Sequence, residues 1–293
     1  MLHKIFFLLN FLLLGSVRLF AQTTDSSDYY YNIGLEEKNA NKFQLAANSF
    51  DKALEFNPTN IDVLMANAYV HMEMRRMDKS IVFFDKVHQL DPGNTKPIKE
   101  LMNLYYNYHR YDKAIDFANK CKDCNESVRI IGMSAYQQED YTLSAQKLTE
   151  YLSKNPKDAE ATYTLARTYI DMEEYNKAIP LLDSAVTFPE AKSMWMYEQA
   201  ILNYNMGFYK KATAAFQNAI DHGHHQSSDF KENHGFSCLY SGDLDKGEKL
   251  LMEVWSKKTG NKDILRGTSE VLFQLNQFDR SLKYCQKLLE LDP

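Results

Sequence analysis

The hydrophobic positions of this chain recur with a period of about 34 residues. In each period a large apolar residue stands at one fixed place, and a small residue follows it three positions later. The large residues are Phe43, Met77, Tyr111, Tyr141, Tyr175, Tyr209, Leu244 and Phe278, and the small ones are Ala46, Ser80, Ala114, Ser144, Ala178, Ala212, Gly247 and Ser281. The remaining apolar residues of a period follow helical spacing, with one polar interruption. The pattern therefore predicts two helices in each repeat.

Capping residues and prolines indicate where these helices begin and end. The first helix of a repeat is expected to follow a cap such as Ser27, Asn60, Asn94 or Asp158, whose side chain can accept bonds from the first turn. The second helix is expected to stop before an Asn-Pro or Asp-Pro pair, because proline cannot continue it. A helix pair of this length cannot bury its apolar side alone, so the repeats must stack on one another.

These positions resemble the tetratricopeptide repeat. The first repeat carries most of the pattern, with Tyr30, Gly34, Ala46, Phe50, Ala53 and Pro58. The resemblance implies an all-α fold, an α-solenoid of about eight helix hairpins wound into a right-handed superhelix, with the first helix of each hairpin lining a concave groove. The expected repeats are residues 27–60, 61–94, 95–124, 125–158, 159–192, 193–227, 228–261 and 262–293, after a short lead at 22–26.

The first 21 residues have the layout of a secretory signal peptide. A positive start with Lys4 precedes an apolar run over residues 5–17, and a polar break with Ala21 follows it. The run is shorter than the roughly 20 residues that span a bilayer. We therefore expect an exported protein of the periplasm, the cell envelope or the medium, with an uncleaved anchor as the alternative. The chain would then not be an integral membrane protein if the segment is cleaved.

The charge of the chain argues against nucleic acid as a partner. The whole sequence has a net charge of −5, and removal of residues 1–21 would make it −7, because that segment holds Lys4 and Arg18 and no acid. Binding to phosphates requires a basic field. The resemblance instead implies a protein or peptide partner.

By the same resemblance, positions 5, 9 and 12 of each first helix face the groove. Tyrosine, methionine and arginine are prominent there, and these residue types are enriched at recognition surfaces. The charged members Lys99, Arg129 and Arg167, with Arg266 further on, are basic, which suggests an acidic or carboxylate-bearing partner. The alternative is that individual tyrosines only pack between helices. The expected groove residues are Tyr31, Met65, Tyr69, Met72, Lys99, Asn103, Tyr106, Arg129, Met133, Tyr136, Tyr163, Arg167, Tyr197 and Tyr204.

Cys121 and Cys124 stand three residues apart in "NKCKDCNES". The third repeat is four residues short, which places the pair on the last turn of its second helix. There the side chains stand further apart than a disulfide requires, unless the turn tightens. Two buried thiols and a structural disulfide both stay open. A zinc site is disfavoured, because Cys238 and Cys285 lie several repeats away and a repeat touches only its neighbours.

Four of the eight histidines fall within "DHGHHQSSDFKENH". His222, His224 and His225 lie in a predicted loop and are weak candidates for a metal such as Zn²⁺ or Cu²⁺, since no thiol or carboxylate cluster completes a site. His234 is expected to face the interior. No phosphate loop, nucleophile elbow, paired-histidine zinc helix or dinucleotide fingerprint occurs, so we expect neither an enzyme nor a cofactor.

The sequence therefore predicts an exported, non-enzymatic scaffold that binds a partner polypeptide in its groove, with a role in assembling the cell envelope or secretion machinery. One alternative is the sensory or ligand-binding N-terminal part of a longer membrane signalling protein. A second alternative is a metal-handling protein that uses the loop at His222–His225.

Overall fold

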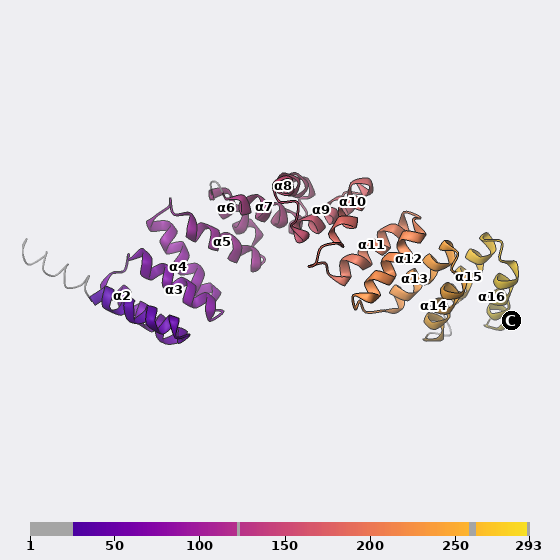
Figure 1. Cartoon of the computed structure of the whole chain (residues 1–293), viewed down its shortest axis with the longest axis horizontal. Helices are drawn as coiled ribbons and strands as arrows, with labels where there is room; N and C mark the ends of the chain where they lie inside the picture. The colour runs from indigo at the N-terminus through magenta and orange to yellow at the C-terminus, as the bar shows by residue number, and fades with distance from the viewer. Residues whose placement is uncertain (1–25, 122–123, 258–261, 292–293) are drawn as a thin grey trace, which may run out of the picture. The chain divides into compact units, whose positions relative to one another are not determined.

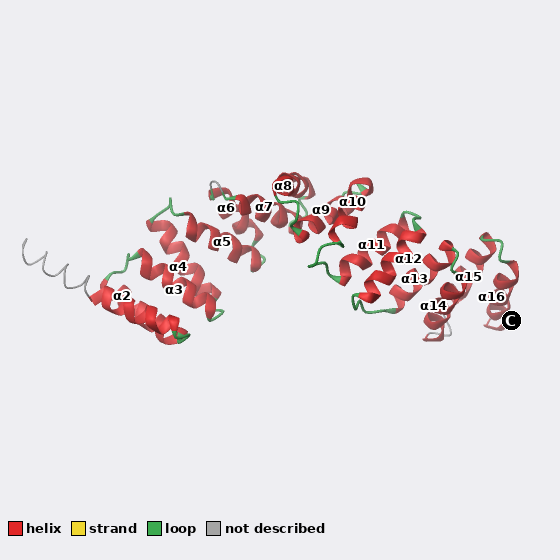
Figure 2. Ribbon diagram, in the orientation of Figure 1, coloured by secondary structure: helices red, strands yellow, loops and turns green. Residues whose placement is uncertain are grey.

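A computed structural model describes residues 26–121, 124–257 and 262–291, and every regular element within these ranges is an α-helix (Figure 2). Residues 1–21, with the predicted signal peptide, lie outside them. Residues 26–39 form the first described helix. The others, labelled in Figure 1, are α2 (Phe43–Phe56), α3 (Ile61–Glu73), α4 (Met77–Leu90), α5 (Thr95–Asn107), α6 (Tyr111–Lys120), α7 (Asn125–Gln137), α8 (Tyr141–Lys154), α9 (Ala159–Asp171), α10 (Tyr175–Ala185), α11 (Ser193–Asn205), α12 (Tyr209–Asp221), α13 (Ser228–Ser241), α14 (Leu244–Lys257), α15 (Lys262–Gln274) and α16 (Phe278–Leu291).

The helices form hairpins, as the apolar pattern predicts. Each hairpin turn contains one residue with a left-handed backbone, two positions before the recurrent large apolar residue. In the turn between α3 and α4, Arg75 has φ 56°, and the N–H of Arg76 donates to the carbonyl of His71 at 2.8 Å. This arrangement closes the end of the first helix and reverses the chain. The other left-handed residues of these turns are Asn41, His109, Glu139, Glu173, Gly207, Gly242 and Asn276.

Three of the four predicted caps are present. The side chains of Asn60, Asn94 and Asp158 accept bonds from backbone N–H groups in the first turns of α3, α5 and α9. The prediction for Ser27 is wrong, because the chain is already helical at residue 26. Ser27 is instead buried, and its hydroxyl donates to the carbonyl of Ala53 in α2 at 3.1 Å, which ties the two helices of the first hairpin together.

The recurrent small residues lie where the two helices of a hairpin cross. Ala46, Ser80, Ala114, Ser144, Ala178 and Ala212 are fully buried. Glycine serves the same purpose on the partner helix: a Cβ added to Gly132 in α7 would come within 2.8 Å of Leu148 Cγ in α8. Close backbone approach therefore explains why small residues recur at these positions.

The contacts divide the chain into an N-terminal unit, which ends at Tyr151, and a C-terminal unit, which begins at Leu152 within α8. Inside each unit, successive hairpins stack through neighbouring helices. In the N-terminal unit α2 packs on α3, α4 on α5 and α6 on α7; in the C-terminal unit α10 packs on α11, α12 on α13 and α14 on α15. First helices also meet one another, as α5 and α7 do in the N-terminal unit and α11, α13 and α15 do in the C-terminal unit. This is the neighbour-to-neighbour packing of an α-solenoid.

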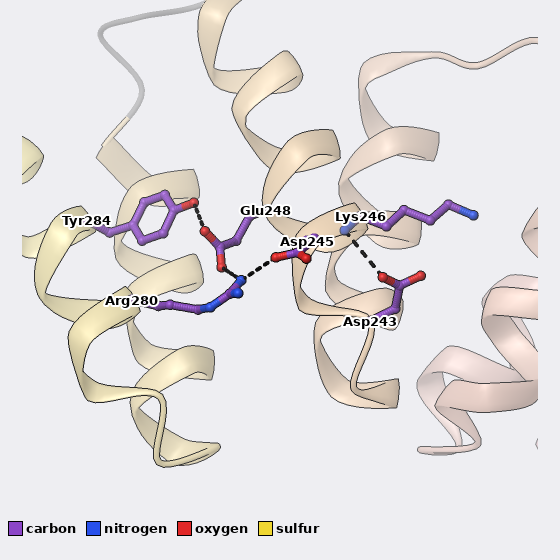
Figure 3. Close-up of polar contacts among 6 residues, drawn as sticks. All are labelled: Asp243, Asp245, Lys246, Glu248, Arg280 and Tyr284. Atoms are coloured by element: carbon purple, nitrogen blue, oxygen red, sulfur yellow. Dashed lines mark hydrogen bonds and ion pairs between the residues drawn. The ribbon is translucent and has the colours of Figure 1, made fainter.

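A polar network joins the last two hairpins of the C-terminal unit. The guanidinium of Arg280 in α16 donates to Asp245 and to Glu248 in α14, both at 2.7 Å, and the hydroxyl of Tyr284 donates to the same Glu248 at 2.9 Å (Figure 3). At the start of α14, Asp243 accepts from the N–H of Lys246 at 3.4 Å. Charged hydrogen bonds thus reinforce the apolar stacking of these hairpins.

The short repeat contains a disulfide, between Cys121 and Cys124, whose Cα atoms are 5.5 Å apart. The sequence placed the pair on the last helical turn, and this is wrong. Helix α6 has only 10 residues and ends at Lys120, whereas α7 begins at Asn125. The four missing residues are thus taken from α6. Because the cysteines lie in the connection between helices, helical geometry does not hold their side chains apart.

No helix of the described ranges combines the length and the apolar composition that crossing a membrane would require.

Candidate functional site

The predicted groove positions lie on first helices, and most of their side chains are half-buried. This group comprises Tyr31, Met65, Tyr69, Met72, Asn103, Tyr106, Arg129, Tyr136, Tyr163, Arg167, Tyr197 and Tyr204. Lys99 is exposed on α5. Met133 on α7 is only 3% exposed, so its assignment to a binding surface is wrong. Met133 is one of the buried residues of α7, so position 9 of that helix faces the core.

Several of the tyrosines pack against the second helix of their own hairpin. The ring of Tyr69 in α3 meets that of Phe84 in α4 edge to face at 5.3 Å, and Tyr31 lies 5.9 Å from Phe50. Tyr106, Tyr136 and Tyr204 make similar ring contacts within their hairpins. Packing between helices therefore accounts for part of the tyrosine stripe, which was the alternative to a binding role.

A cavity of about 850 Å³ lies on the C-terminal unit, along the successive first helices α9, α11 and α13. This volume is within the usual range for ligand pockets, roughly 300–1,000 Å³. Two predicted groove residues, Arg167 and Tyr197, line it. The other lining residues are Ile170, Asp171, Tyr175, Glu198, Ile201, Leu202, Asn205, Met206, Asp229, Glu232 and Asn233.

On the α9 side of the cavity, the carboxylate of Glu198 is held by two groups. The hydroxyl of Tyr163 donates to its Oε2 at 2.7 Å, and Arg167 Nε lies 3.8 Å from the same oxygen. Burial, followed by the bond to Glu198, raises the pKa of Tyr163. The ring of Tyr163 also stacks on Trp195 at 4.4 Å, so it supports the wall and fixes Glu198 in place.

On the α13 side, Asp229, Glu232 and Asn233 face the cavity. Burial raises the pKa of the Glu232 carboxyl, and the neighbouring carboxylates of Asp229 and Asp263 raise it further. Tyr197 of α11, whose ring stacks on Phe230 of α13 at 5.4 Å, has a raised pKa because of burial and because of Asp229. Several groups here therefore favour the presence of a positive charge.

The charge of this cavity differs from the sequence-based expectation of a basic groove. Among the residues that the structure describes, its lining holds four carboxylates and a single guanidinium, that of Arg167. Arg167 is partly neutralised by Glu198, and Arg266, the other basic residue noted in this unit, lies 3.5 Å from Asp263. The basic bias of the groove positions therefore does not extend to this cavity.

Sequence reasoning missed Glu198, Asp229, Glu232 and Asn233. The repeat register could have identified Glu232, because it occupies position 5 of the repeat at 228–261. That repeat is the least regular, and no groove residue was named in it. Glu198 stands one residue after the predicted Tyr197 and turns to the same cavity.

In the histidine-rich loop, His222 and His224 contact neighbouring groups of the protein. The ring of His224 stacks on Tyr197 at 4.8 Å and on Phe230 at 5.4 Å. His222 Nδ1 lies 2.9 Å from the carbonyl oxygen of Asn218, and His225 is exposed. Within the part of the chain that the structure describes, no group of three or more His, Cys, Asp or Glu side chains could hold a metal ion. His234 is 1% exposed and faces the interior as expected.

The disulfide also has a structural setting. Cys121 and Cys124 are 4% and 6% exposed and belong to the apolar core around α5, α6 and α7. A redox-active pair needs access to its substrate. The burial of these two cysteines therefore favours a structural role for the disulfide. Among the described residues, the cavity is lined by apolar, amide, phenol and carboxylate groups and the guanidinium of Arg167, without a cysteine, serine or histidine that could act as a nucleophile. The arrangement suits binding.

Comparison with protein families gives two matches, both to tetratricopeptide repeat models. One covers residues 135–187, and the other covers residues 27–60 and 269–293. Among curated proteins, the BBSome complex member BBS4 of Bos taurus is 25% identical over 179 residues, which are 58% of this chain and 34% of that protein. A TPR repeat-containing protein of Methanocaldococcus jannaschii is 20% identical over 250 residues, 80% of this chain and 41% of that protein. The chain thus spans less than half the length of these relatives.

Solved structures show the same fold. A tetratricopeptide repeat protein from Parabacteroides merdae superposes with a TM-score of 0.56 at 14% identity, over 85% of this chain and 99% of that one. The MamA protein superposes with a TM-score of 0.52 at 16% identity, over 55% of this chain and 91% of that one.

Proposed function

Because the chain is a tetratricopeptide repeat protein, we propose that it is a non-enzymatic scaffold that binds a segment of another polypeptide along its first helices. The cavity on α9, α11 and α13 carries this proposal. Its apolar residues, such as Ile201 and Met206, offer contact area, whereas Asn205 and Asn233 offer hydrogen bonds. Recognition sites for proteins combine an apolar centre with a small number of directed polar groups in this way.

We further propose that the protein is exported and works in assembling the envelope or the secretion machinery. The basic start, apolar run and small residue of positions 1–21 support export. N-terminal sequencing of the protein recovered outside the cytoplasm should begin near residue 22. Recovery of the intact N-terminus from the soluble cytoplasm would contradict export.

An acidic or carboxylate-bearing partner remains our proposal for the N-terminal unit only. It is supported by Lys99, exposed on α5, and by Arg129 on α7. For the C-terminal unit the acidic lining argues otherwise.

Site-specific photo-crosslinking tests the scaffold function. A photoreactive phenylalanine replaces Ile201 in the cavity or, as the control, Leu282, which is 56% exposed on the second helix α16. In cells that express the full chain naturally, we expect an adduct with a polypeptide from position 201 and none from position 282. That polypeptide, purified, should then bind the purified chain. Equal adducts from both positions, or none from position 201, would overturn the proposal.

A further inference from the structure

The two sides of the cavity on α9, α11 and α13 are unequal in how their charges are balanced. On the α9 side, Glu198 interacts with Tyr163 and Arg167. On the α13 side, the carboxylates of Asp229 and Glu232 make no hydrogen bond or ion pair with any residue that the structure describes. The nearest lysine along the helix, Lys231, is bonded at 2.6 Å to Glu253 of α14 and does not neutralise them. The α13 side therefore carries negative charge that no cation of the described residues neutralises.

Asp229 and Glu232 lie one helical turn apart, so their side chains share a face of α13. Asp229, in the first turn, is stabilised by the helix dipole. Glu232 is half-buried and gains less from it, since the effect falls off beyond the first turn. Two like charges on one face of a cavity favour the entry of a cation.

Helices α9 and α11 give the cavity an apolar surface as well. Ile170, Ile201, Leu202 and Met206 line the cavity beside the rings of Tyr175 and Tyr197. Lysine and arginine side chains have a long aliphatic stem that packs against such a surface while the charged end reaches a polar one. An acidic side chain would meet repulsion here, and a purely apolar one would leave the carboxylates without a partner.

We propose that this cavity receives a lysine or arginine side chain of the bound polypeptide, with its charge at Asp229 and Glu232 and its stem along Ile201 and Met206. This inference rests on the proposed scaffold function and specifies the chemistry of the partner in the C-terminal unit. Preference for a basic side chain would distinguish this unit from the N-terminal unit, where Lys99 and Arg129 are on the corresponding helices.

Peptide mixtures test the proposal with the full chain. Four fluorescent, end-capped hexapeptide mixtures of the same random composition differ only in one central residue: lysine, arginine, norleucine or glutamate. Norleucine keeps the aliphatic stem of lysine and removes its charge. In fluorescence anisotropy, we expect the lysine and arginine mixtures to bind about tenfold more tightly than norleucine, which corresponds to about 1.4 kcal/mol. Their affinity should fall as NaCl is raised.

Matched variants identify the carboxylates. Glu232→Gln and Asp229→Asn should each reduce the preference for lysine over norleucine several-fold. Glu190→Gln removes the same charge from an exposed position outside the cavity and should leave the preference unchanged. Circular dichroism checks the fold of each variant, and the lysine–norleucine comparison on the unaltered chain needs no variant at all.

The outcomes separate this inference from the proposed function. Preference for glutamate or norleucine, no binding of any mixture, or a lysine preference that Glu232→Gln and Asp229→Asn leave intact would each overturn the basic-side-chain assignment. If crosslinking from position 201 still finds a polypeptide in those cases, the scaffold function stands with a different partner chemistry. If crosslinking from position 201 also finds no polypeptide, the basic-side-chain assignment and the scaffold function are both overturned.

Discussion

The backbone of Gly235 in α13 lies against that of Gly247 in α14, close enough that a Cβ on Gly247 would come within 2.9 Å of the Gly235 carbonyl oxygen. The same Cβ would also lie 2.8 Å from Leu239 Cγ. Because a backbone atom cannot give way as a flexible side chain does, this helix crossing depends on the absence of a side chain at position 247.

We therefore expect Gly247→Ala to lower the free energy of unfolding by about 1–3 kcal/mol, as overpacking of a core does. Alanine is the better helix former by about 1 kcal/mol, so a gain in stability would show that the crossing can widen without cost. Urea unfolding followed by circular dichroism measures the change. Gly93→Ala serves as the control, because a Cβ there would meet only Asp91 Oδ1 at 3.6 Å, and this variant should be neutral.

The second prediction concerns pH and the buried His234. Its ring stacks on Phe216 at 5.1 Å, and neither ring nitrogen has a hydrogen-bond partner among the described residues. Burial, followed by the charge of Lys246, lowers the pKa of His234 from 6.5 to about 4. The unfolded chain therefore binds a proton that the folded chain does not bind between these two values.

Stability from this residue is fully present above about pH 6.5 and is lost as the pH falls towards 4. The loss should reach about 3 kcal/mol, since one pKa unit corresponds to 1.36 kcal/mol. Urea titrations at pH 7.5, 5.5 and 4.5 should show the decline in the unaltered chain and a smaller decline in His234→Leu. Parallel declines in the two proteins would show that other groups account for the acid sensitivity.

The third prediction concerns the disulfide between Cys121 and Cys124. On the chain-entropy estimate, closing so short a loop contributes about 2 kcal/mol. The double variant Cys121→Ala, Cys124→Ala should therefore unfold at lower urea, and a reductant should shift the unaltered chain to the same midpoint. The reductant should not affect the double variant, because the remaining cysteines, Cys238 and Cys285, are free thiols. A shift in the double variant would contradict this explanation.

The fourth prediction uses the hairpin turns. Glu139 holds a left-handed backbone, φ 62°, between α7 and α8, where Gly207 and Gly242 serve in the later hairpins. For a residue with a Cβ this conformation costs about 1–2 kcal/mol, and the greater flexibility of glycine when unfolded offsets part of that cost. Glu139→Gly should therefore raise the melting temperature slightly. Asn41→Gly should raise it less, because asparagine tolerates this backbone, and a decrease with Glu139→Gly would count against backbone strain.

The sequence predicts the hairpins well, because their signals are local. The first helices α3, α5, α7, α9, α11, α13 and α15 begin at Ile61, Thr95, Asn125, Ala159, Ser193, Ser228 and Lys262, the residues at which the expected repeats begin. The residues that specify a turn, and the apolar residues that specify a helix, each lie within a few positions of one another in the sequence. The placement of Cys121 was wrong, since the length of a repeat does not say which of its helices is shortened.

The cavity was less accessible to prediction, because its charge depends on residues from different hairpins. Tyr163 and Glu198 are 35 residues apart, yet they share a hydrogen bond, and Arg167 meets the same carboxylate. Two of the basic residues noted in the sequence, Arg167 and Arg266, thus pair with carboxylates in the structure. The repeat register placed Arg167 and Tyr197 among the groove positions, and both line the cavity, but their neighbours across the hairpins determine the net charge.

The cavity touches α9 and α13, which belong to hairpins separated by the one that α11 begins. In a solenoid, hairpins cooperate only with immediate neighbours, so each can open with little effect on distant ones. A bound polypeptide in contact with both α9 and α13 would couple the opening of three hairpins. Amide hydrogen exchange should then slow in all three at once, and occupancy would determine whether this stretch of the array opens piecemeal or as a single block.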